Sequence, residues 1–154
     1  MRSSRATNLI CALAASILLS ACPSQPVQSA PDAVVLLQNI PPANPAKYAD
    51  AREKKVWQNP YLIIRAESIG LLSGVSANEE RLLKPEEVLD ALASLPPSAW
   101  PYGRVAAVLV QEEPGNSEPE KVALRRNRGA VAGALESAHT EIVWMVAPTA
   151  KDRR

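Results

Sequence analysis

The sequence predicts an α+β domain in which four strands form one antiparallel-rich sheet and the helices pack on one face of it. Two observations carry this prediction. Short apolar runs alternate with longer segments whose apolar residues recur at helical spacing. Prolines and charged residues mark the boundaries between these segments. The expected order is strand, strand, helix, strand, helix, strand, within a small domain at residues 48–148 of the 154-residue chain.

The first two strands are expected at residues 61–65 and 69–73. Both runs are apolar and partly β-branched, and Ala66-Glu67-Ser68 separates them, which is the spacing of a hairpin. The charged segment before them, residues 47–58, has few apolar positions and suits a short helix that ends at Asn59-Pro60.

Two further helices are expected, each opened by a proline followed by acidic residues. Pro85-Glu86-Glu87 opens the first, which Pro96-Pro97 ends, and Pro119-Glu120 opens the second, which runs to about Ser137. Proline is tolerated in the first turn of a helix, and carboxylates are favourable at the positive end of the helix dipole. Apolar residues at helical spacing give each helix one side that can be buried.

The last two strands complete the expected sheet. After Arg104 the run to Val110 is apolar at every position, which predicts a central strand covered on both faces. Residues 142–146 form the final strand, in which we expect Trp144 to belong to the core. A polar tail at residues 149–154 follows.

Residues 1–22 have the layout of an export signal. A basic start is followed by an apolar stretch too short to span a membrane comfortably, and the segment closes on Leu19-Ser20-Ala21-Cys22. This ending resembles the lipobox of bacterial lipoproteins. The resemblance implies that residues 1–21 are a signal peptide removed by cleavage and that Cys22 is acylated. The mature chain would then be anchored to a membrane by lipid without a transmembrane helix.

The alternative is an ordinary secretory signal or a single anchor helix in which the cysteine is incidental. The lipoprotein resemblance also implies a location. The residue after Cys22 is Pro23 rather than the aspartate that favours inner-membrane retention in some bacteria. A cell-envelope protein that faces the periplasm is therefore expected, on the outer membrane rather than the inner one.

Residues 22–47 are expected to be the lipidated cysteine and a proline-rich tether. Prolines spread among Ser, Gln, Ala and Asn cannot bury enough apolar area to offset the entropy of ordering. The apolar run at residues 33–37 is the exception. It suits a short strand that docks either on the chain's own domain or on a partner.

Charge and cysteine content narrow the function further. The chain has 17 basic and 16 acidic residues, and loss of Arg2 and Arg5 with the signal leaves 15 against 16. A net charge near zero gives no long-range attraction for nucleic acid. Since Cys11 lies in the discarded segment and Cys22 carries lipid, no disulfide is expected.

Motifs for catalysis, metals and cofactors are missing from the sequence. His139 is the only histidine, so the usual zinc ligand sets cannot form. Neither a nucleophile elbow nor a glycine-rich phosphate loop is present. We therefore expect a non-catalytic protein that holds no cofactor or metal. The alternative left open is an envelope hydrolase or accessory enzyme that uses His139 with nearby acids such as Glu112-Glu113.

Two features are candidates for binding a partner. Lys121, Arg125 and Arg128 recur at i, i+4 and i+7 and so share one stripe of a helix. They could contact anionic head groups or a partner's carboxylates, or simply form a solvated helix face. Trp100 and Tyr102 stand among prolines, where aromatic rings form a binding rim or cover the edge of a core.

Three segments carry a resemblance to a known family. These are the helix opening at residues 83–89, the apolar strand that ends in two glutamates at residues 104–113, and residues 131–146. Over residues 60–148 this pattern resembles the periplasmic domain of the ExbD/TolR biopolymer-transport family. The resemblance implies a similar fold and a tendency to dimerise or to bind envelope proteins. Members of that family carry a transmembrane helix with a proton-coupling aspartate, whereas no acid precedes Asp32 here, so the motor function is not implied.

Overall fold

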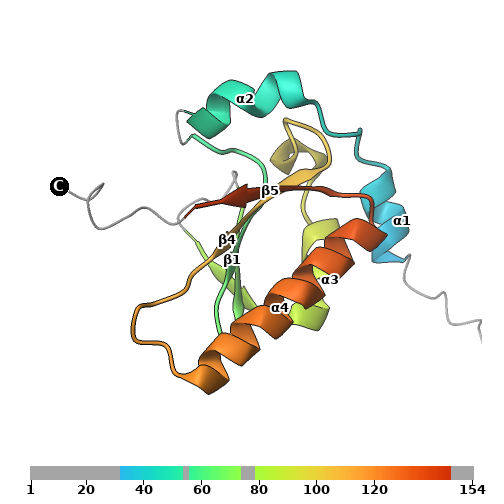
Figure 1. The fold of residues 1–154 in the computed structure, drawn as a ribbon. Coiled ribbons are helices and arrows are strands. Elements are labelled where there is room, and N and C mark those ends of the chain that lie inside the picture. The colour runs from blue at the N-terminus through green and yellow to red at the C-terminus, as the bar shows by residue number, and fades with distance from the viewer. Residues whose placement is uncertain (1–31, 54–55, 74–78, 147–154) are drawn as a thin grey trace, which may run out of the picture.

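A mixed sheet forms the centre of the fold. Within residues 32–53, 56–73 and 79–146, which the computed structural model describes, five strands pair in the order β3-β2-β1-β4-β5. The strands are β1 Tyr61–Ile64, β2 Ile69–Leu72, β3 Arg81–Leu83, β4 Val105–Val110 and β5 Glu141–Met145. The α-helices are α1 Ala33–Gln38, α2 Pro45–Glu53, α3 Val88–Ala93 and α4 Glu118–Ser137, and 3₁₀ turns lie at Pro85–Glu87 and Pro97–Ala99 (Figure 1).

The α+β class is confirmed, but the prediction of four strands is wrong. The extra strand is β3. It has three residues, of which only Leu83 is buried, so it is too short to show an apolar run in the sequence. The sheet is also less antiparallel than expected. β1 pairs antiparallel with β2 and β2 with β3, whereas β4 lies parallel to both β1 and β5. The element order accordingly has a third strand before α3, and two helices precede the first strand.

The expected hairpin and central strand are both present. Ile64 pairs with Ile69 at the turn of the β1–β2 hairpin. β4 lies between β1 and β5, and its residues from Val105 to Val108 are buried. An apolar run without alternation therefore marked an interior strand, since both of its faces are covered.

Helix α1 occupies the run that was expected to be a strand. Asp32 caps it by accepting a hydrogen bond from the backbone N–H of Val34 at 3.0 Å. Leu37 is fully buried in the main core, and α1 packs against α3. The packed part of the described chain therefore includes α1, ahead of the domain start that was expected at residue 48. The signal peptide, Cys22, the expected tether up to residue 31 and the tail at residues 149–154 lie outside the described residues.

A single arginine ties α1 to the sheet. The Arg104 guanidinium donates to the carbonyls of Leu37 and Ile40, each at 3.3 Å, and to the His139 carbonyl at 2.9 Å. It therefore joins the C-terminal end of α1 to the turn between α4 and β5. As a result, α1 lies beside the C-terminal end of α4 (Figure 1).

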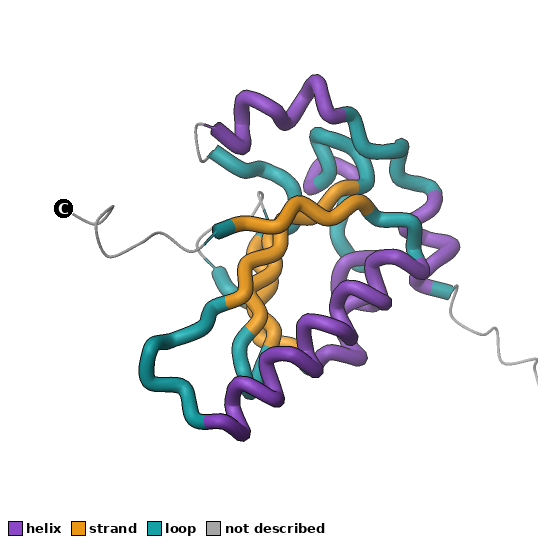
Figure 2. The backbone as a smooth tube through the Cα atoms, in the orientation of Figure 1, coloured by secondary structure: helices purple, strands orange, loops and turns teal. Residues whose placement is uncertain are grey.

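Helices cover both faces of the sheet, and the prediction of one covered face is wrong. Ala106 on β4 faces the main core, where α1, α3 and α4 pack. Val105, next to it, faces the opposite side, where α2 contributes Tyr48 to a second small core. The rings of Tyr48 and Tyr102 flank Trp57 there, with centroids 5.8 and 5.4 Å from the Trp57 ring. Figure 2 shows α2 on the other side of the strands from α3 and α4.

Asn59 connects the segment before β1 to the segment before β4. Its buried amide nitrogen donates to the carbonyls of Gly103 and Val105, at 2.7 and 2.8 Å, and its oxygen accepts from the Tyr102 N–H at 2.9 Å. Only glycine fits at position 103. The φ of Gly103 is +83°, and a Cβ at this position would lie 2.2 Å from the Pro42 carbonyl oxygen. These contacts fix the start of β4 against both neighbouring segments.

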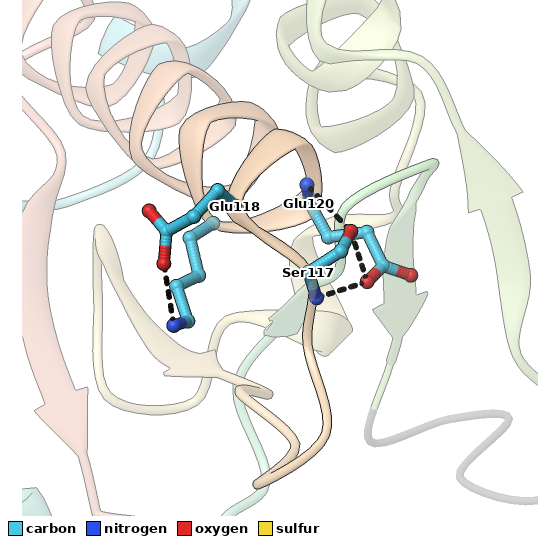
Figure 3. A network of polar contacts seen from close by, with 4 residues as sticks. Ser117, Glu118 and Glu120 are labelled. Carbon is cyan, nitrogen blue, oxygen red and sulfur yellow. Dashed lines mark hydrogen bonds and ion pairs between the residues drawn. The ribbon is translucent and has the colours of Figure 1, made fainter.

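A capping box starts α4 one residue earlier than the sequence indicated. The Ser117 N–H and hydroxyl donate to the Glu120 carboxylate at 2.6 and 2.8 Å, and the Ser117 oxygen faces the Glu120 N–H in return (Figure 3). Hydrogen bonds from the Ser117 backbone and then from its hydroxyl lower the pKa of Glu120. The ionised carboxylate is the form that this cap favours.

Replacing Ser117 with alanine is expected to lower the free energy of unfolding by about 1 kcal/mol at neutral pH, as is usual for a lost cap. Because the folded-state pKa of Glu120 is depressed, its contribution is present above its ordinary pKa and is lost as the pH falls through the folded-state value. Urea denaturation at pH 7 and pH 3 should therefore show a smaller difference between parent and variant at pH 3. A difference that grows in acid would contradict this reading of the cap.

No helix in the described part of the chain is both long enough and apolar enough to cross a membrane.

Candidate functional site

A shallow groove lies between α4 and the end of β4. It has a volume of about 200 Å³, and it is lined by Val110, Glu112, Lys121, Leu124, Arg125 and Arg128. Cavities for whole drug-sized ligands usually measure roughly 300–1,000 Å³. The basic groove, as we call it, therefore suits one or two side-chain groups of a larger partner better than a complete small molecule.

The predicted basic stripe forms one wall of this groove. Lys121, Arg125 and Arg128 lie on α4 at positions that 3.6 residues per turn bring to one side. Leu124 on the same helix is buried against the core and fixes the rotation of the stripe. The opposite wall comes from the end of β4 and the residues after it, which the stripe alone could not indicate.

The three cations differ in how their charge is balanced. The Lys121 ammonium is 2.8 Å from the Glu118 carboxylate, one turn away (Figure 3). Arg125 is exposed and has no ion pair or hydrogen bond with any other residue in the described ranges. Glu112 is the acidic residue among those that line the basic groove. The charge available to a bound anion is therefore concentrated at Arg125, with Arg128 beside it.

Arg128 links the basic groove to an exposed tryptophan. Its guanidinium carbon lies 4.6 Å from the centre of the Trp144 ring, a distance at which a cation is attracted to an aromatic face. The prediction that Trp144 belongs to the core is wrong, because its side chain is 37% exposed. The reason is its place on β5, which is an edge strand and is covered less completely than β4. Arg128, which lines the groove, thus also contacts a partly exposed aromatic ring that sequence reasoning missed.

Trp100 and Tyr102 do not form a surface. Both rings are buried, Trp100 in the main core and Tyr102 in the second core under α2. The structure therefore agrees with the alternative in which these aromatics cover core edges. Neither side chain is available to a partner in this structure, and the binding role considered for them is not supported.

His139 and the acidic pair Glu112-Glu113 are not brought together. His139 is exposed in the turn before β5, where its φ is +51°. Because β5 begins opposite Val105 in a parallel pair, His139 lies at the amino end of β4, whereas the acids follow its carboxyl end. A six-residue strand separates these ends by roughly 20 Å. Among the described residues there is also no cluster of three or more His, Cys, Asp or Glu able to hold a metal ion.

Comparison of the chain with protein-family models, with curated proteins and with solved structures gives no match. The basic groove is therefore interpreted from its own geometry and charge.

Proposed function

We propose that the chain is a cell-envelope lipoprotein, anchored through lipid on Cys22, whose domain binds a partner without catalysis. The basic groove is the binding site in this proposal. Its ligand is a carboxylate-bearing segment of an envelope protein. The observation that carries the proposal is Arg125, an exposed cation without a partner among the described residues, in a groove shared with Arg128 and Lys121.

The chemistry of the basic groove supports this ligand class. An arginine guanidinium offers paired N–H donors that match the two oxygens of a carboxylate. Val110 adds half-buried apolar surface, and the Trp144 ring lies next to Arg128. A segment with acidic and apolar side chains would satisfy both parts, which a free inorganic anion would not.

The position of the basic groove favours a protein partner over the lipids of the chain's own membrane. α1, the first described helix after Cys22, lies at the C-terminal end of α4, as the bonds of Arg104 require. Arg125 lies 12 residues before Ser137, about 18 Å away along the helix axis. α1, the described helix that is nearest to Cys22 in the sequence, is therefore separated from Arg125 along α4.

The remaining parts of the proposal rest on the sequence. They are the lipobox at residues 19–22, the outer-membrane location that Pro23 favours, and a likeness to the ExbD/TolR periplasmic domain. The α+β architecture is compatible with that likeness. A second copy of the chain is the alternative partner, and the experiment below distinguishes it by the mass of the product.

Arg125→Glu is expected to reduce partner binding at least about tenfold, because it replaces the unpaired cation with a charge that repels carboxylates. The measurement is photo-crosslinking in intact cells from a light-activated residue placed at Glu112, which lines the basic groove. The parent should give a crosslinked product of defined mass. Arg125→Glu should lose it.

Arg126→Glu is the matched control. Arg126 is exposed on the same helix but is not part of the groove lining, so this variant has the same net charge and an intact groove. It should keep the crosslinked product. Equal loss in both variants, or no product in the parent, would refute the proposed role of the groove.

A further inference from the structure

Helix α1 exposes two neighbouring apolar side chains. Val35 is 54% exposed and Leu36 is 38% exposed, although Leu37, the next residue, is fully buried. They are the one pair of large exposed hydrophobic residues that are adjacent in sequence within the described ranges. None of the six residues of α1 is charged. Burying this side of the helix against another surface therefore does not require a charged side chain of α1 to lose its hydration.

The distance from the anchor limits where this surface can lie. Ala33, the first residue of α1, follows Cys22 by 11 positions. Even a fully extended chain of that length spans at most about 40 Å. If Cys22 carries lipid, α1 is held within that distance of the bilayer. A tether this short raises the effective concentration of the surface at the membrane, so that a contact too weak to bind alone can persist.

We propose that the exposed side of α1, formed by Val35 and Leu36, rests on the bilayer surface and orients the domain with its basic groove facing away. This inference depends on the lipid anchor of the proposed function. Arg104 supports the orientation, because it fixes the end of α1 to the turn after α4. The N-terminal half of α4, which carries the groove residues Lys121 and Arg125, then points away from the membrane, toward the space from which a partner would approach.

Site-directed spin labelling of the acylated chain tests this orientation. A nitroxide is attached at Val35→Cys, and separately at Val122→Cys, which is exposed to the same degree, 55%, but lies on α4 near the groove. The acylated Cys22 thiol does not react, so each variant carries one label. The chain is reconstituted in vesicles of phosphatidylethanolamine and phosphatidylglycerol. Collisions with oxygen, which concentrates in lipid, are compared with collisions with a water-soluble nickel chelate.

The label at position 35 is expected to have an oxygen-to-nickel collision ratio several-fold higher than the label at position 122. Equal ratios would overturn the proposal, and so would a label at position 35 that is shielded from both reagents, because protein rather than lipid would then cover α1. The mass of the mature N-terminus is measured on the same preparation. An unmodified Cys22 refutes the anchor and this inference together, whereas an acylated Cys22 with a water-exposed label refutes the α1 contact alone.

Discussion

Replacing Asn59 with alanine is expected to lower the free energy of unfolding by about 3 to 4 kcal/mol. The variant loses three buried hydrogen bonds and leaves the Tyr102 N–H and the carbonyls of Gly103 and Val105 without their side-chain partner. A buried polar group that loses its partner costs about 1–3 kcal/mol, which is more than the net gain of an ordinary hydrogen bond. Urea denaturation followed by circular dichroism measures the change.

Asn39→Ala is the control for this prediction. Asn39 is exposed at the end of α1, and its side chain makes no hydrogen bond with the described part of the chain. Its loss should change stability by no more than about 0.5 kcal/mol. If Asn59→Ala also stayed within that range, the connection between the segments before β1 and β4 would not hold the fold together as described.

Leu37→Ala is expected to destabilise the domain by about 2 to 4 kcal/mol, the usual effect of removing a fully buried leucine side chain. This variant tests whether α1 belongs to the folded domain. In a free tether the same change would have almost no effect. The comparison is made by thermal and urea unfolding of the chain with and without the substitution.

Leu36→Ala provides the matched control one position away. Leu36 is exposed on the same helix, so its truncation should cost less than about 1 kcal/mol. Two equal and small effects would mean that α1 does not dock on α3, and the domain would then begin after it.

The sequence predicted the elements whose patterns are local. The β1–β2 hairpin, β4 and α4 each have either a continuous apolar run or helical spacing bounded by turn residues and prolines. α1 was predicted as a strand because a short run of apolar, β-branched residues is compatible with either structure. Asp32, which caps the helix, was the signal that favoured the helical alternative.

The candidate site was predictable only in part. Helical spacing alone placed Lys121, Arg125 and Arg128 together. The contribution of Glu112 and the position of Trp144 under Arg128 depend on how β4 and β5 pair with each other and pack beside α4. Trp144 was expected in the core, whereas for Trp100 both a binding rim and a core edge were considered. The strand position of Trp144 suggested burial, but an edge strand leaves it partly exposed, while the proline-rich loop around Trp100 folds into the core.

The mass of the mature N-terminus in the membrane fraction tests most directly whether the domain is held at a membrane by lipid. We expect a chain that starts at Cys22 and carries the added mass of a diacylglycerol, with or without a further acyl group on its amino terminus. An uncleaved chain, or a mature chain with an unmodified Cys22, would contradict the lipid anchor.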